Sequence, residues 1–140
     1  LKFLKKKISG NFILTNSDTI FDLNIKNFLN FHKKNNFQFS MIVTKKKYQI
    51  PYGICDINQK GMIKKLSEKP SMHFNINSGL YILNSKCLKY IPKTGKFDIT
   101  ELINKLLKNN IKIGAYFVPD SSVIDVGKWS DFNKLNIKKN

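Results

Sequence analysis

Two aspartates, Asp18 and Asp125, stand where this chain could hold a metal ion. Asp18 follows the apolar residues 12–15 in a polar loop, and Asp125 follows the apolar pair at positions 123–124. In open α/β sheets, ligands collect outside the carboxyl ends of the strands, and carboxylates there suit a hard cation such as Mg²⁺. Either aspartate alone could equally cap a turn or a helix. The pair predicts a shared metal site if the fold brings the two carboxylates together.

Glu68 and Lys69 could bind a phosphorylated ligand that is rich in hydroxyl groups. A glutamate accepts hydrogen bonds from hydroxyl groups, and a lysine neutralises a phosphate as a point charge. Both residues precede Pro70, which restricts the backbone of the residue before it. A surface ion pair, which contributes little to stability, is the alternative interpretation.

Two glycines fall at the edges of expected strands, where a missing side chain lets a ligand approach the backbone. Gly53 follows Tyr52, and Gly79 lies two positions after Asn77. The amide of Asn77 could bind a hydroxyl group. Ordinary turn chemistry explains each of these residues equally well when each is taken singly.

The other residues with reactive side chains do not form a recognisable site. His32 is expected to pack on the apolar face of a helix, and His73 has no Cys or His partner at ligand spacing. Cys55 and Cys87 are too few for a disulfide framework. Trp129 is expected in the core. No Walker loop, GxGxxG motif or Ser/His/Asp arrangement occurs.

The composition fits one cytoplasmic domain with its own core. The chain has 140 residues, of which 41% are hydrophobic and 12% aromatic, a content too apolar for disorder. No apolar run approaches the roughly 20 residues that span a bilayer. The lysine-rich start also lacks the apolar stretch and cleavage site of a signal peptide. We therefore expect a cytoplasmic protein without a membrane partner.

The formal net charge of +16 invites a nucleic-acid-binding interpretation. All 25 basic residues are lysine, however, and arginine, which planar recognition of phosphates and base edges prefers, is absent. An AT-rich coding sequence tends to produce this composition whatever the protein does. A basic nucleic-acid-binding domain is therefore the alternative ranked last, and we expect no nucleic-acid partner.

The elements that would position these residues alternate between strands and helices. Residues 12–15 predict a strand buried on both faces, the apolar period between residues 25 and 32 predicts a helix, and residues 37–44 predict the next strand. A strand–helix–strand unit of these lengths predicts parallel strands.

The rest of the chain adds a hairpin and further strands and helices. Residues 52–57 and 62–66 flank a turn signal at positions 58–61 and predict a β-hairpin. The remaining expected elements are the end of a helix at 1–8, a strand at 77–83, a short helix near 85–90, a helix at 99–108 after a capping box, strands at 111–117 and 123–124, and a last helix that carries Trp129. Together they predict one α/β domain, a Rossmann-like mixed, mainly parallel sheet flanked by helices with an inserted β-hairpin.

The order of these motifs resembles that of the nucleotide-sugar pyrophosphorylases, the sugar-1-phosphate nucleotidyltransferase family. Five stretches carry the resemblance and cover nearly the whole chain: FILTNSDTI at 12–20, PYGICD at 51–56, LSEKP at 66–70, NINSGLYIL at 75–83 and VIDVG at 123–127. The mannose-1-phosphate guanylyltransferase-like branch looks most similar. The resemblance implies the nucleotide-diphospho-sugar transferase fold, with residues 1–140 as the C-terminal portion of a single nucleotidyltransferase domain.

The resemblance also implies roles for individual residues. Asp18 and Asp125 look like the two catalytic aspartates that hold Mg²⁺ beneath the nucleotide phosphates, and Lys69 looks like the catalytic lysine on the sugar phosphate. The residues implied to bind the sugar phosphate are Tyr52, Gly53, Glu68, Lys69, Asn77 and Gly79. The implied partners are a nucleoside triphosphate and a sugar 1-phosphate, and the implied products are an NDP-sugar and pyrophosphate.

The chain departs from the family pattern in one large respect. The glycine-rich N-terminal loop, with its arginine and following lysine, is absent from these 140 residues, and Asn16-Ser17-Asp18 replaces the commoner glycine-aspartate pair. We therefore expect this chain alone to be inactive. A non-catalytic transferase-like domain that senses a sugar phosphate is the alternative, although a sensor needs no metal-binding pair. The sequence leaves the sugar, the nucleotide and a homo-oligomeric state open.

Overall fold

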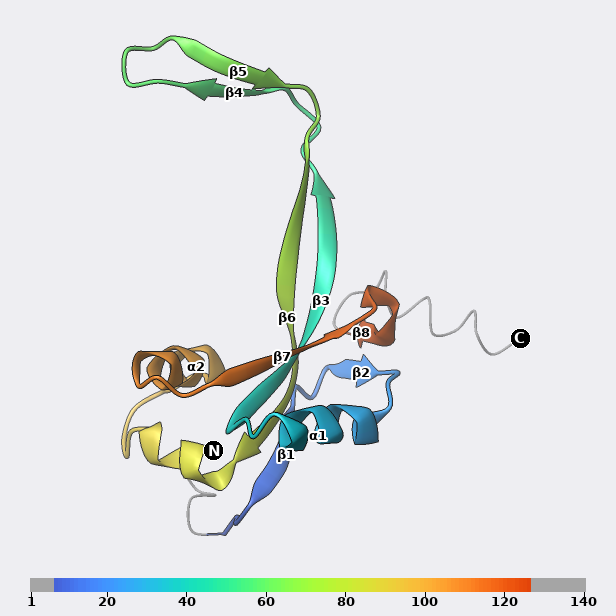
Figure 1. Ribbon diagram of the computed structural model, residues 1–140, viewed down its shortest axis with the longest axis vertical. Coiled ribbons are helices and arrows are strands. Elements are labelled where there is room, and N and C mark those ends of the chain that lie inside the picture. Colours follow the sequence, from blue (N-terminus) through green and yellow to red (C-terminus); the bar gives the residue numbers. More distant parts are fainter. Residues whose placement is uncertain (1–6, 127–140) are drawn as a thin grey trace, which may run out of the picture.

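A four-stranded mixed sheet lies at the centre of the body in the computed structural model, which describes residues 7–126 (Figure 1). In spatial order its strands are β1 (Asn11–Thr15), β6 (Ser71–Asn84), β3 (Phe39–Gln49) and β7 (Ile113–Val118). β6 runs antiparallel to both β1 and β3, whereas β3 and β7 are parallel. Strands β1, β3 and β7 therefore share one direction. This confirms the predicted mixed, mainly parallel sheet.

Helices cover both faces of this sheet because the side chains of β6 alternate between them. Leu80 and Ile82 point to the face covered by α1 (Ile25–Lys34). Tyr81 and Leu83 point to the face covered by the short 3₁₀ helix η2 (Ser85–Tyr90) and by α2 (Ile99–Lys108). The result is a three-layer α/β/α body with two cores, one on each side of the sheet.

The helix boundaries follow from local capping. Asn24 begins α1, and its side-chain oxygen accepts hydrogen bonds from the backbone N–H groups of Lys26 and Asn27. In α2 the Glu101 carboxylate accepts a hydrogen bond from the Asp98 backbone N–H at 2.6 Å. Both helices were predicted from these signals, and the predicted bounds of α2 agree with the observed ones.

β3 and β6 continue beyond the sheet as a two-stranded arm (Figure 1). The arm ends where Gln49 pairs with Ser71, and it carries the hairpin of β4 (Ile54–Ile57) and β5 (Ile63–Ser67). In the hairpin turn, Asn58 Oδ1 accepts hydrogen bonds from the N–H groups of Lys60 and Met62. The predicted hairpin is therefore confirmed.

A second, smaller pairing joins β2 (Thr19–Phe21) to β8 (Val123–Asp125), just after the 3₁₀ turn η3 (Asp120–Ser122). Phe21 and Val123 pack against the core under α1. This packing holds the short ladder against the body of the domain.

The structure corrects three sequence predictions. β1 is not buried on both faces: its side chains alternate in exposure, with 49% of Ile13 exposed, because it is the last strand of the described sheet. β6 extends well beyond the predicted strand at 77–83 because its outer half pairs only with β3 in the arm. His32, expected to pack half-buried on its helix face, is fully buried there. The expected helix end at 1–8 lies mostly outside the described residues 7–126, and the expected helix carrying Trp129 lies wholly outside them.

The two cysteines are free thiols, as predicted. Cys55 is exposed in the hairpin, and Cys87 is buried in the core beneath η2. Burial raises the pKa of the Cys87 thiol to about 11, which keeps it protonated and unreactive. Within residues 7–126, no helix has both the length and the apolar character that crossing a bilayer requires.

His32 makes the stability of the fold depend on pH. Only 1% of the residue is exposed, its Nδ1 lies 2.8 Å from the Ser40 hydroxyl, and its Nε2 is buried with no hydrogen-bond partner in the described structure. Desolvation by burial lowers the pKa of His32 below its ordinary value of 6.5. The folded protein therefore keeps this imidazole neutral at pH values where the unfolded chain binds a proton.

We predict that stability falls as the pH drops below 6.5, because the unfolded state then gains a proton that the folded state does not bind. Urea unfolding at about pH 7.5 and about pH 5.5 measures the difference, and His32→Gln should reduce it. His73, which is exposed, supplies the control: His73→Gln should keep the pH dependence of the unmodified protein. Equal pH dependence in the His32→Gln variant would contradict the prediction.

Candidate functional site

The ladder between β2 and β8 brings the backbones of Asp18 and Asp125 close together. Thr19 pairs with Asp125, and the N–H of Val126 donates a hydrogen bond to the Asp18 carbonyl at 3.0 Å. Asp18 and Asp125 therefore occupy neighbouring rungs of one short ladder, although more than a hundred residues separate them in the sequence. The sequence predicted that both aspartates end short strands, and the tertiary structure supplies their proximity.

Gly79 fixes the loop that carries Asp18. The N–H of Asn16 donates a hydrogen bond to the Gly79 carbonyl at 2.9 Å. Gly79 has a φ of +83°, and a Cβ atom there would lie 2.5 Å from Asn16 Nδ2. Only glycine combines this backbone conformation with so close a neighbour. In the described structure the Asn16 side chain occupies the space beside Gly79, and the approach of a ligand to this glycine stays a prediction.

Asn77 is held in one orientation by two hydrogen bonds. Its Nδ2 donates to the Tyr81 hydroxyl at 2.9 Å, and its Oδ1 accepts from the Gly79 N–H at 3.2 Å. Tyr81 is 2% exposed, and burial raises the pKa of its hydroxyl, so this partner stays protonated near neutral pH. The Asn77 amide is consequently pre-oriented before any ligand arrives.

A polar cavity of about 180 Å³ lies between the Asp18 loop, the base of the arm and β8. Its lining residues come from six segments of the chain: Asn16, Thr19, Thr44, Lys46, Ile76, Asn77, Ser78, Asp120, Val123 and Asp125. Asp18 itself is exposed and is not among them. A larger hollow of about 380 Å³ beside η2 has no carboxylate in its lining and lies away from these residues.

Lys46 and Asp120 form an ion pair at the cavity, with 3.3 Å between Lys46 Nζ and Asp120 Oδ1. Neither Lys46 nor Asp120 is among the candidate residues that the sequence indicates. The spacing of Lys46 in the sequence does point to it: Thr44 and Lys46 are two residues apart in a strand, so their side chains lie on the same face. Thr44 is buried and bonds to the Ser78 hydroxyl, which marks that face as the cavity side.

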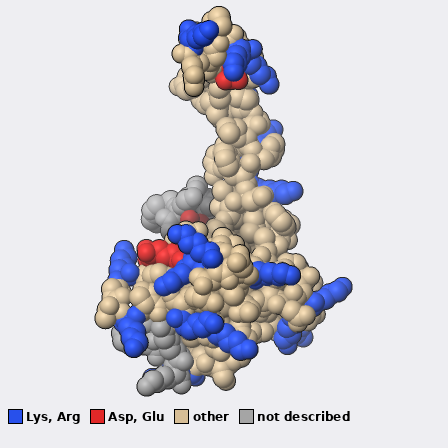
Figure 2. Space-filling model, turned by 60° about the vertical axis from the view of Figure 1, so that its left-hand side comes forward, with Lys and Arg blue, Asp and Glu red and all other residues tan. Residues whose placement is uncertain are grey.

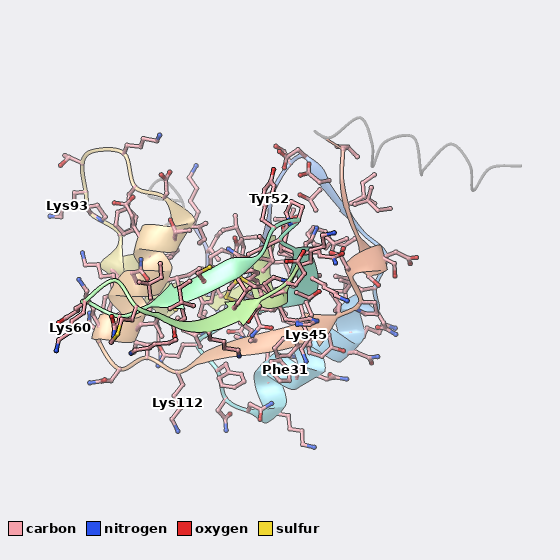
Figure 3. All side chains as sticks on the ribbon, turned by 90° about the horizontal axis from the view of Figure 1, so that it is seen from above. Phe31, Lys45, Tyr52, Lys60, Lys93 and Lys112 are labelled. Carbon is pink, nitrogen blue, oxygen red and sulfur yellow. The ribbon has the colours of Figure 1, made fainter. Side chains whose placement is uncertain are left out.

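The predicted sugar-binding residues on the hairpin lie away from the polar cavity. Tyr52, Gly53 and Glu68 stand at the base of the β4–β5 hairpin, at the far end of the arm (Figure 1). Figure 3, which looks down the arm, shows Tyr52 and Lys60 toward opposite ends of this hairpin. From Asn77 to Ser71, β6 advances by six residues, which is about 20 Å along an extended strand. The structure therefore separates these residues from the cavity.

The hairpin base nevertheless brings two of the predicted residues into contact. A Cβ atom on Gly53 would lie 3.0 Å from a carboxylate oxygen of Glu68, so the glycine leaves space for that carboxylate. Lys69 adopts a positive φ of 44° between Glu68 and Pro70. The Ile50 N–H donates to the Pro70 carbonyl at 3.0 Å and closes the turn. Glu68 and Gly53 therefore form one local unit.

The donor atoms near Asp18 and Asp125 fit Mg²⁺ better than a structural metal. Within the described residues, no group of three or more His, Cys, Asp or Glu side chains could hold a metal ion. A structural zinc site needs such a group. Mg²⁺ keeps several water ligands and binds through one or two carboxylates together with substrate phosphates. Asp125 and the hydroxyl and amide oxygens of the cavity are donors of that kind, and Asp18 lies on the neighbouring rung, outside the cavity lining.

A three-layer α/β/α body with a polar cavity next to the carboxyl end of β1 is an arrangement in which open α/β domains bind ligands such as nucleotides. The comparison with protein families agrees with this arrangement. A model described as nucleotidyl transferase matches residues 1–140, so the chain belongs to that family.

Individual relatives support the same assignment. Mannose-1-phosphate guanyltransferase 2 of Candida glabrata is 33% identical over 135 residues, which cover 94% of this chain and 37% of the relative. The bifunctional protein GlmU of Methanococcus aeolicus is 29% identical over 145 residues, covering 94% of this chain and 32% of the relative. The crystal structure of HddC from Yersinia pseudotuberculosis is similar with a TM-score of 0.64 at 25% identity, over 99% of this chain and 60% of that chain. The chain spans about a third of the length of these curated relatives.

We predict that Gly79→Ala destabilises the protein more than Gly61→Ala does. Both glycines have a positive φ, but a Cβ at Gly61 would meet nothing within 4 Å, whereas one at Gly79 would overlap Asn16. Gly61→Ala should cost about 1–2 kcal/mol for backbone strain alone, and Gly79→Ala about 1–3 kcal/mol more. Urea unfolding measures both, and adding Asn16→Gly to Gly79→Ala should restore part of the loss. Equal losses at the two glycines would refute the packing argument.

Proposed function

We propose that this chain contributes the metal-binding aspartates and the sugar-phosphate pocket of a sugar-1-phosphate nucleotidyltransferase. The observation that carries the proposal is the β2–β8 ladder, which joins Asp18 to Asp125 beside the Asn77 cavity. Membership of the nucleotidyl transferase family supports it. The full protein would join a nucleoside triphosphate to a sugar 1-phosphate in nucleotide-sugar biosynthesis, in the cytoplasm. The names of the relatives make mannose 1-phosphate and GTP the first pair to test.

The proposed reaction is an in-line displacement. A phosphate oxygen of the sugar 1-phosphate forms a bond to the α-phosphorus of the triphosphate. The bond between that phosphorus and its bridging oxygen breaks, and pyrophosphate leaves with the electron pair. Phosphoryl transfer of this kind needs positioning and charge stabilisation rather than a covalent enzyme intermediate.

The residues of this chain would hold the reactants in that geometry. Asp18 and Asp125 would hold Mg²⁺, which when bound supplies a Lewis acid and a template for the phosphates. Asn77, oriented by Tyr81 and Gly79, would accept or donate a hydrogen bond at a sugar hydroxyl. The motif order predicts a role for Glu68 and Lys69 at the sugar as well, but in the described structure they lie beyond about 20 Å of strand from Asn77 and do not line the cavity.

The distribution of charge gives no support to the nucleic-acid alternative. Figure 2 shows lysine side chains scattered over the body and at the tip of the arm, rather than gathered into one stripe. Nucleic-acid-binding domains concentrate basic residues on one face or along one helix.

The first test is removal of either aspartate from the full-length protein. Asp18→Asn and Asp125→Asn should each lower kcat/KM for NDP-sugar formation at least about 100-fold, because each removes a carboxylate from the metal site. Pyrophosphate release in the presence of Mg²⁺ measures the rate. Part of the loss should be recovered at higher Mg²⁺ concentration. Asp22→Asn is the matched control, because Asp22 is exposed next to β2 and does not line the cavity.

Turnover that survives both substitutions would contradict the enzymatic proposal. Binding of a sugar 1-phosphate without turnover in the unmodified full-length protein would favour the sensor alternative instead. Unfolding curves of all three variants show whether a loss of rate reflects a loss of structure.

The second test concerns the hairpin base. If the hairpin base contacts the sugar phosphate, as the motif order predicts, Glu68→Gln and Lys69→Met should each raise the KM for the sugar 1-phosphate about 10-fold and leave the KM for the triphosphate unchanged, because each would remove one polar contact. Lys60→Met, at the exposed hairpin turn, is the control with the same change of charge as Lys69→Met. An unchanged KM in both test variants would remove the hairpin from the proposed pocket.

A further inference from the structure

We infer that Lys46 binds a phosphate group of the substrate in the Asp125–Asn77 cavity, and that Asp120 holds the Lys46 ammonium group in place until that phosphate arrives. The inference rests on the proposed function, because it assigns a residue to the binding of its sugar phosphate. It concerns a lysine that the motif comparison did not select.

The alternation of side chains along β3 turns Lys46 toward the cavity. Thr44 and Lys46 both line it, which is the expected consequence of their two-residue spacing. The neighbouring lysine, Lys45, lies on the other face, where its ammonium group sits 5.5 Å from the centre of the Phe117 ring. Lys47 is exposed further along the arm. Of these three consecutive lysines, Lys46 is therefore the one whose side chain lines the cavity.

Lys46 is the one cationic side chain among the described residues that line the cavity. Two of the other lining residues, Asp120 and Asp125, carry carboxylates. Without Lys46, the only charged side chains of the described lining would be these two carboxylates, which repel a phosphate at short range. Lys69, the lysine expected to meet the sugar phosphate, is on the arm, beyond the roughly 20 Å of strand that separates Asn77 from Ser71.

A phosphate can replace Asp120 as the partner of Lys46. The Lys46 and Asp120 side chains are 36% and 50% exposed, so the pair at 3.3 Å is solvated and contributes little to stability. A phosphate offers a lysine more charge and more acceptor oxygens than a single carboxylate does. Replacement of Asp120 by the substrate is therefore favourable, and Asp120 keeps the long lysine side chain near the cavity in the meantime.

The test compares three variants of the full-length protein. Lys46→Met should raise the KM for mannose 1-phosphate, and its dissociation constant in calorimetry, about 10- to 100-fold, because a charged hydrogen bond is lost. Lys47→Met changes the net charge equally on an exposed position and should leave both constants unchanged. Binding of mannose, which has no phosphate, should not differ between the two variants.

Asp120→Asn separates a binding role from a structural one. If Asp120 competes with the phosphate for Lys46, removing its charge should tighten binding of mannose 1-phosphate by about 2- to 10-fold. If the ion pair only supports the fold, Lys46→Met and Asp120→Asn should weaken binding in the same direction. Opposite effects of the two substitutions therefore support the inference, and weakening by both overturns it.

The outcomes also distinguish this inference from the proposed function. Normal transfer by the unmodified protein, together with equal KM values in Lys46→Met and Lys47→Met, overturns the inference and leaves the proposed function in place. Failure of the unmodified full-length protein to form any NDP-sugar, tested with several sugar 1-phosphates and triphosphates, overturns the proposed function and the inference with it.

Discussion

The backbone pairing of β2 with β8 is the constraint on which the candidate site depends. A ladder of three residues per strand has too little hydrogen bonding and buried surface to persist alone. It is held because Phe21 and Val123 pack into the core beneath α1 and because the backbone of Asp22 bonds to Ser122 at 2.9 Å. The apolar ends of these two strands thus fix the polar ends, where Asp18 and Asp125 lie.

β6 connects the β2–β8 ladder and the cavity beside it to the rest of the domain. Its inner half pairs with β1 and β3 and supplies side chains to the cores on both faces of the sheet. At the boundary between its halves, Gly79 receives Asn16, and Asn77 is oriented by Tyr81. Its outer half forms the arm that carries the hairpin. A buried, rigid strand therefore positions a polar cavity, which is the arrangement that precise ligand binding requires.

The body and the arm differ in how far they bury their apolar side chains. The buried side chains of the two cores belong to the body, whereas large apolar side chains such as Tyr48, Ile63 and Leu66 are more than half exposed on the arm and hairpin. Tyr48 and Phe74 pack edge to face, with ring centroids 5.8 Å apart. Two paired strands without a covering layer cannot bury their side chains, so the body must stabilise the arm.

The sequence by itself determined the local elements and the types of residue at the site. Capping residues set the starts of α1 and α2, a turn signal set the β4–β5 hairpin, and motif order proposed Asp18, Asp125, Glu68 and Asn77 as candidates. These features depend on neighbours within a few positions, so the linear sequence contains them.

Only the tertiary structure decided which residues meet. It inserted β6 antiparallel between β1 and β3, placed Asp18 beside Asp125, and turned Lys46 toward Asp120. It also put Glu68 at the far end of a long arm. Pairing between distant segments depends on the shape and packing of the whole core, and residue types and spacing along the chain do not specify it.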